Sequence, residues 1–191
     1  MRKVLRPAVT MLLLWSVVTG LLYPLTVSGM ARILFPFEAE GSLIRDRSGA
    51  VLGSHLIGQP FADPAYFWGR PSATSPGPYN GAASSGSNLG PTNPALARAV
   101  SDRIVRLRAV DPDNRASVPA DLVTASASGL DPHISPAAAE YQVARVARYR
   151  HLSVETVRAL VARCTEPPTF GILGQHRVNV LSLNLLLDGK S

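Results

Sequence analysis

A continuous apolar stretch dominates the start of the chain. Pro7 to Ala31 contain no charged side chain over 25 residues. A helix of that length would be about 37 Å long, enough to cross a hydrocarbon core of roughly 30 Å with some tilt. Basic residues cluster before the stretch and are sparse after it, and such residues tend to stay in the cytoplasm. We therefore predict cytoplasmic residues 1–6, a transmembrane helix over 7–31, and an extracytoplasmic domain over 32–191.

The same stretch has a second interpretation, a cleaved secretory signal that ends in the small residues Val27–Gly29 or Gly29–Ala31. The apolar run exceeds the ~7 to 15 residues of a usual signal core, which favours a retained helix. Gly20 and Gly29 would allow a neighbouring membrane helix to approach closely. Both glycines are therefore candidate partner contacts.

Beyond the apolar stretch, short segments and one long loop precede the first helix. Residues 42–46 and 50–57 flank Arg47–Gly49, a pattern that predicts a hairpin. Residues 58–94 are rich in glycine, proline, serine and asparagine, with interleaved aromatic residues. Because disordered linkers are poor in aromatics and long ordered loops tend to be functional, we expect a packed loop with a binding role. Its candidate partner contacts are Tyr66, Phe67, Arg70, Asn88 and Asn93.

Cap-and-proline patterns predict the helices of the remaining chain. Asn93 before Pro94 opens a helix whose apolar positions recur on one face. Ser135 before Pro136 and Ser153 before Val154 begin two more. Residues 178–187 are nearly all apolar and fit either a strand or a helix, with the helix favoured. The predicted fold class is α+β, a helix-rich domain attached to one membrane helix.

Charge and cysteine content exclude several classes of protein. Arg2, Lys3 and Arg6 account for three of 19 basic residues, which leaves 16 basic against 13 acidic residues in the rest of the chain. That balance is too mild for a nucleic-acid surface. Cys164 is the single cysteine, so the chain has no internal disulfide framework and no cysteine-based metal site. The scattered histidines show no metal-ligand spacing.

Two motifs are candidates for a binding or catalytic site. Gly81 and Gly86 have the spacing of a phosphate-binding loop, but Ser87 and Asn88 stand where a lysine and a hydroxyl residue are required, so a structural turn is favoured. The nucleotide-contact candidates there are Gly86, Ser87, Asn88 and Gly90. A second motif brings Asp131, His133 and Ser135 together, but no nucleophile elbow surrounds them, and turns and caps are the favoured roles. We predict no catalytic residue.

Several segments together closely resemble one family along the whole chain. They are Leu56–Gln59, Tyr66–Ala73, Ser85–Pro94, Val118–Ser126, Gly129–Ser135 and Arg177–Leu181. In this order and spacing they resemble the C subunit of the Kdp-type potassium-transporting P-type ATPase, although Ser85 stands where some members carry a glycine.

The resemblance implies a non-catalytic subunit of a high-affinity potassium uptake complex in the bacterial inner membrane. Its implied partners are a channel-like subunit that selects potassium, a P-type ATPase subunit that hydrolyses ATP, and a small fourth subunit. The family's C subunit has been described as a chaperone that raises the ATP affinity of the hydrolysing subunit through a transient ternary complex, with no tightly bound cofactor. The predicted orientation places the domain away from cytoplasmic ATP, which favours a cap over the potassium entrance with indirect coupling. Both hypotheses stay open at this point.

Overall fold

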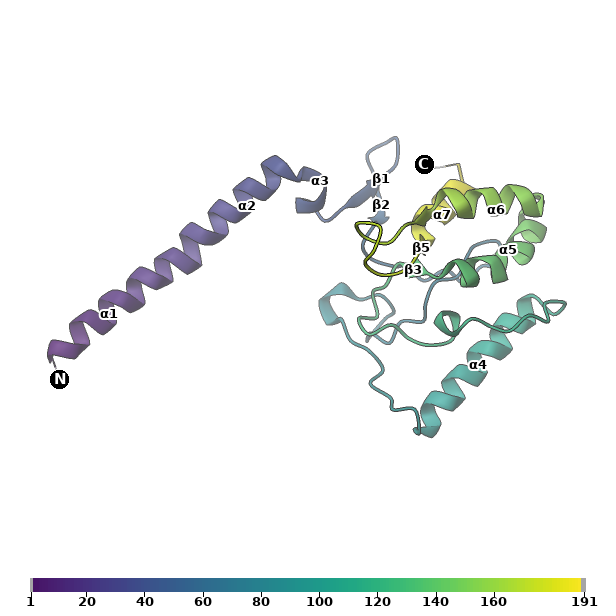
Figure 1. The fold of residues 1–191 in the computed structure, drawn as a ribbon, viewed down its shortest axis with the longest axis horizontal. Helices are drawn as coiled ribbons and strands as arrows, with labels where there is room; N and C mark the ends of the chain where they lie inside the picture. The colour runs from purple at the N-terminus through teal and green to yellow at the C-terminus, as the bar shows by residue number, and fades with distance from the viewer. Residues whose placement is uncertain (1, 190–191) are drawn as a thin grey trace. The chain divides into compact units, whose positions relative to one another are not determined.

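The computed structural model describes residues 2–189, with side chains from residue 4 onward, and divides the chain into two compact units, Met1–Leu43 and Ile44–Ser191. The first unit is a long helical rod, in which α1 (Arg2–Val17), η1 (Val18–Leu22) and α2 (Tyr23–Leu34) follow without a break (Figure 1). The segment Val4–Leu34 is long and apolar enough to cross a membrane, and no residue of its most apolar 18-residue stretch is buried. The prediction of one membrane-spanning helix is thereby supported, whereas the side of the membrane on which each end lies stays a prediction.

The rod contains one widened turn, which Pro24 explains. The N–H of Tyr23 bonds to the carbonyl of Val18, five residues earlier, in place of the usual four. A proline inside a helix lacks the N–H for its own bond and crowds the carbonyl four residues before it, which here belongs to Gly20. A π-turn directly before Pro24 relieves that crowding and lets the helix continue. A short helix α3 (Pro36–Ala39) follows.

A hairpin precedes the long loop, as predicted. Strand β1 (Leu43–Arg45) pairs with β2 (Val51–Ser54). The Asp46 carboxylate closes the turn, because its Oδ1 accepts the N–H groups of Ser48 at 2.8 Å and Ala50 at 2.9 Å. Gly49 has a φ of 84°, a conformation that glycine adopts at little cost.

The core of the domain is a small antiparallel sheet packed with three helices. Strand β5 (Arg177–Asn179) lies between β3 (His133–Ile134) and β4 (Thr165–Glu166). Helices α5 (Pro136–Arg150) and α6 (Val154–Arg163) pack against each other, and α7 (Val180–Leu187) contacts α6 and β5 (Figure 1). The buried apolar side chains of this core include Ile134, Val143, Val146, Val157, Val178 and Leu183.

The predicted caps begin the helices where the sequence placed them. Ser135 and Ser153 accept the N–H groups of Ala138 and Thr156, each at 3.0 Å. Asn179 ends β5 and also caps α7, since its Oδ1 accepts the N–H of Ser182 at 3.0 Å. The favoured helix is thus confirmed for residues 180–187, and residues 178 and 179 belong to the strand instead.

Helix α4 (Pro94–Val110) and the long loop complete the domain. Asn93 caps α4, and Leu107 is its one buried residue, while Val100 and Ile104 are half-buried against the core. The loop over 58–94 is ordered and contains only the short turn η2 (Gly81–Ala83) as a helical element. A second short turn, η3 (Ala120–Leu122), follows α4. The aromatic part of this loop is packed, with Phe67 and Trp68 buried, whereas residues 81–94 are mostly exposed. The binding role stays a prediction.

Candidate binding site

The aromatic segment of the loop is held by side-chain amides in place of a neighbouring strand. Asn184 on α7 accepts the N–H of Phe67 at 2.9 Å and donates to its carbonyl at 3.0 Å. Gln142 on α5 accepts the N–H of Trp68 at 2.8 Å and donates to its carbonyl at 3.1 Å. Each amide supplies the donor and acceptor pair that a strand residue would offer. The extended segment is thereby fixed to two helices with its buried backbone groups satisfied.

A buried arginine completes this support. Arg145 is 2% exposed and donates to the carbonyls of Pro64 and Tyr66 and to Oε1 of Gln142. Its guanidinium carbon lies 4.8 Å from the centroid of the Trp68 ring. Burial lowers the pKa of Arg145 to about 10, so the side chain is still a cation at neutral pH. The charge is therefore met by carbonyl oxygens and an aromatic face.

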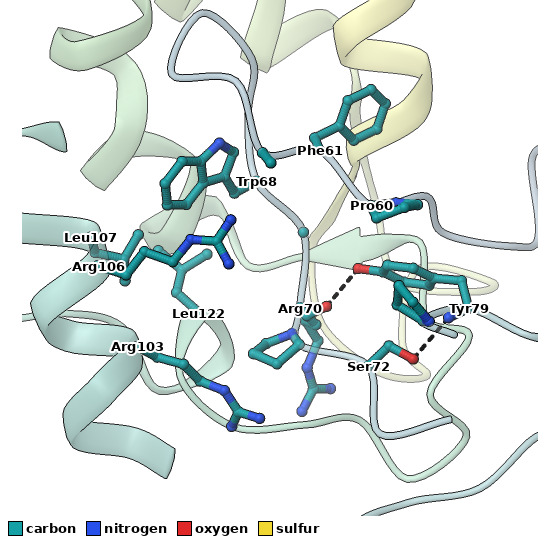
Figure 2. A pocket seen from close by; sticks show the side chains of 14 residues that line it. Pro60, Phe61, Trp68, Arg70, Ser72, Tyr79, Arg103, Arg106, Leu107 and Leu122 are labelled. Carbon is teal, nitrogen blue, oxygen red and sulfur yellow. Dashed lines mark hydrogen bonds between the residues drawn. The ribbon is translucent and has the colours of Figure 1, made fainter. Parts of the chain in front are cut away.

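The held segment forms one wall of a cavity of about 300 Å³, shown in Figure 2. Helix α4 provides the facing wall with Arg103, Arg106 and Leu107, and Leu122 of η3 also lines the cavity. The cavity walls are mainly aromatic rings, prolines and aliphatic side chains. Three guanidinium groups, those of Arg70, Arg103 and Arg106, line the space, and none of its 14 lining residues is acidic. The cavity therefore combines an apolar surface with excess positive charge.

Tyr79 fixes the far side of this cavity. Its hydroxyl donates to the carbonyl of Arg70 at 2.5 Å, and its N–H donates to the Ser72 hydroxyl at 2.9 Å (Figure 2). Burial, assisted by the charge of Asp131, raises the pKa of Tyr79 to about 12. A Cβ at Gly58 would lie 2.4 Å from the Tyr79 ring, so only glycine leaves room for the ring there. The phenol is a neutral structural donor.

Arg70 joins the cavity to a network of acids and histidines. One Nη of Arg70 lies 3.1 Å from the Asp131 carboxylate, whose other oxygen accepts the N–H of His133 at 3.0 Å. Burial acts to raise the pKa of Asp131, but the hydrogen bonds from His133 and Arg70 outweigh it and hold the pKa below its usual range. Glu166 continues the network, with its carboxylate oxygens 3.3 Å from Nε2 of His55 and 3.8 Å from Nε2 of His133.

The network favours structural roles for Asp131, His133 and Ser135, the residues that the sequence brings together. The Ser135 hydroxyl caps α5, while its N–H donates to the Asp121 carboxylate at 2.7 Å. Asp131 orders the turn before β3 and pairs with Arg70. Across the described residues, no three histidine, cysteine or acidic side chains are grouped so as to hold a metal ion.

The candidate nucleotide contacts lie in the extended chain before α4. Gly86 packs closely on Ala127, because a Cβ at Gly86 would be 2.9 Å from that residue's carbonyl oxygen. Ser87, Asn88 and Gly90 are exposed. None of these four residues lines either the cavity of Figure 2 or the neighbouring cavity beside Asp131 and His133. A nucleotide contact at this loop stays a prediction.

The candidate partner contacts fall in very different surroundings. A Cβ at Gly20 or Gly29 would meet nothing within 4 Å, so both helix positions are open. Tyr66 is half-buried and donates to the Asp188 carboxylate. Arg70 is half-buried in its pair with Asp131, Asn88 is exposed, and Asn93 caps α4.

Phe67 requires a correction. Its side chain is 0% exposed and belongs to the hydrophobic core, so it cannot face a partner. The Asn184 amide holds the backbone of Phe67, and the ring packs in the core. In the sequence this aromatic residue looked the same as the half-buried Tyr66 beside it, because the loop has no periodicity that would separate inner from outer positions.

Sequence reasoning also missed two groups of surface residues. Arg103 and Arg106 are three positions apart on a helix and therefore neighbours, a signal that could have been noticed. The loop between β4 and β5 presents Phe170 and Ile172, which are 88% and 81% exposed, together with Leu173. Gly171 and Gly174 have positive φ values there, and Thr169 bridges to Leu173. This apolar tip is defined by residues 170–173.

Comparisons with known proteins agree over nearly the whole chain. The family model described as "K+-transporting ATPase, c chain" (KdpC) matches residues 5–189. The potassium-transporting ATPase KdpC subunit of Methylococcus capsulatus is 63% identical over 183 residues, which cover 96% of both chains. The KdpC subunit of Polaromonas naphthalenivorans is 63% identical over 98% of this chain and 95% of the relative. That of Variovorax paradoxus is 62% identical over 100% of this chain and 98% of the relative.

Proposed function

Because the chain belongs to the KdpC family of K+-transporting ATPase subunits, we propose that it is a non-catalytic subunit that a high-affinity potassium uptake complex needs for its assembly. One observation carries this proposal. In the apolar helix Val4–Leu34, the most apolar stretch has no buried residue, whereas residues 44–189 bury a hydrophobic core. A membrane helix whose apolar side chains are exposed is available for packing with other membrane subunits.

The two glycines of the rod lie on different sides of the helix. Gly20 and Gly29 are nine positions apart, which places them about 180° from each other on a regular helix. Gly20 itself lies in the wider turn η1, which changes this angle. A close contact with one partner helix would therefore involve one glycine, and contacts at both would indicate a helix packed between two neighbours.

Co-purification tests the proposal. We expect Gly20→Leu, Gly29→Leu or both to reduce the amount of this chain that is recovered with a tagged ATPase subunit in mild detergent. Ala8→Leu is the matched control, since it adds the same side chain to the same helix near its start. Full recovery of both glycine variants, at equal expression, would contradict a packed helix.

We further propose that residues 44–189 lie outside the cytoplasm and cover the potassium entrance of the channel-like subunit. The basic residues before the apolar helix support this side. In this position the domain would stabilise the complex and would influence ATP affinity only through coupling across the assembly. The alternative, direct contact with ATP in a ternary complex with the ATPase subunit, requires the opposite orientation and the exposed loop around Ser87 and Asn88.

A further inference from the structure

The cavity in Figure 2 holds positive charge that the described part of the chain does not neutralise. Arg103 donates to the carbonyl of Val123 at 2.7 Å, and Arg106 lies over the Trp68 ring at 5.2 Å. Neither forms an ion pair within residues 4–189, whereas Arg70 shares its charge with Asp131. Two arginines of one helix thus line the same cavity, and no carboxylate is among its lining residues.

Arg103 is half-buried and Arg106 is exposed, and such an arrangement favours an anion that can contact both side chains. Partial burial of the Arg103 guanidinium lowers its pKa, because desolvation acts against the charged form. Like charges at neighbouring positions of a helix also repel each other. A carboxylate or phosphate between them would offset both effects, because the planar guanidinium donates to such groups in pairs.

We propose that this cavity binds an oxyanion, a carboxylate or phosphate group, carried on a compact apolar or aromatic body. The oxyanion would lie between Arg103 and Arg106, and the body would lie against Phe61 and Trp68. The volume of about 300 Å³ and the mixture of apolar walls with a few charged groups are typical of small-ligand sites. The site is separate from the loop over residues 86–90 and does not depend on the proposed function. Its ligand is either a soluble organic anion or an acidic side chain of a partner subunit.

Trp68 provides a direct measurement of binding. The chain has two tryptophans, so Trp15→Phe leaves Trp68 as the single fluorescent reporter, in the cavity wall. The full chain in detergent micelles is titrated with benzoate and with phenyl phosphate at constant ionic strength, and with benzyl alcohol as an uncharged control. We expect a saturable change in fluorescence with the two anions and none with the alcohol.

Variants assign the signal to the arginines. Arg103→Gln and Arg106→Gln should each weaken the affinity about tenfold or more, as the loss of a charged hydrogen bond implies. Arg98→Gln is the matched control, since Arg98 is exposed on the same helix and does not line the cavity. Ala62→Trp keeps both arginines but fills the cavity. This variant should abolish anion binding while its urea midpoint stays equal to that of the parent chain. Anion binding that is absent, or equal in all variants, overturns the proposal.

The source of the oxyanion follows from the same titration on the intact purified complex. Binding that persists in the complex identifies a soluble anion. Binding that is lost on assembly, together with a cross-link from a photoreactive residue at Phe61 to an acidic segment of a partner, identifies a partner carboxylate. Both results support the oxyanion site, and neither depends on the outcome of the co-purification of the glycine variants.

Discussion

Replacement of Gln142 by leucine tests how the loop is held to the helices. The side chain is 1% exposed, and its amide satisfies the N–H and the carbonyl of Trp68 while also accepting a hydrogen bond from Arg145. Leucine has a similar size, so the substitution leaves little empty space and loses little stability through a cavity. The variant instead leaves two backbone groups buried without partners and removes one acceptor from a buried cation.

The expected loss of stability follows from those groups. Each buried donor or acceptor left unsatisfied costs about 1–3 kcal/mol, and more next to a charge. We therefore expect Gln142→Leu to lower the free energy of unfolding by at least about 3 kcal/mol. For a domain of this size that corresponds to a decrease of about 1–2 M in the urea midpoint. Gln175→Leu, at an exposed position, is the matched control and should leave the midpoint nearly unchanged.

Urea unfolding followed by Trp68 fluorescence in the Trp15→Phe background measures both variants. A midpoint for Gln142→Leu close to that of the control would refute the reasoning. It would mean that water or a shifted backbone satisfies the Trp68 peptide groups without the amide, so that the aromatic wall of the cavity is not fixed by Gln142.

Two further predictions concern the acid network and the apolar tip. Asp131→Asn should destabilise the domain by about 1–2 kcal/mol at pH 7. The pKa of Asp131 is lowered in the folded state, so the unfolded chain binds the proton more readily. The advantage of the wild type is therefore present at neutral pH and should disappear as pH falls below the folded-state pKa. Urea midpoints of both proteins at pH 7 and pH 3 check this, and an equal gap at both pH values would contradict it. Phe170→Ser combined with Ile172→Ser should leave the urea midpoint unchanged, because both side chains are exposed, yet reduce co-purification with the partner subunits. Unchanged recovery would show that the tip is not a subunit contact.

Local signals in the sequence predicted much of the fold. The helix that is long and apolar enough to cross a membrane follows from an uncharged run of sufficient length, and the helix starts follow from caps such as Ser135 and Ser153 that act within four residues. The hairpin turn likewise depends on residues within the turn itself, such as Asp46 and Gly49. Each of these features is determined by neighbours in the chain.

The candidate site depends on contacts that local signals do not encode. Asn184 bonds to Phe67 across 117 positions, and Gln142 bonds to Trp68 across 74. In the sequence these amides are ordinary polar residues of helices. The two-residue strands β3 and β4 are too short to show an alternating pattern, and the cavity appears only when α4 packs beside the loop.

The side of the membrane occupied by the soluble domain is the central claim, and cysteine labelling in intact cells tests it most directly. Burial raises the pKa of the Cys164 thiol and keeps it poorly reactive, so Cys164→Ser combined with Ala97→Cys, on the exposed face of α4, gives a better reporter. Lys3→Cys in the Cys164→Ser background reports on the opposite side.

A membrane-impermeant maleimide should label Ala97→Cys in intact cells, and Lys3→Cys only after the membrane is opened. That result would place the domain away from cytoplasmic ATP, as a cap with indirect coupling requires. The reverse pattern would contradict the account and would favour direct contact with ATP through the loop around Ser87 and Asn88.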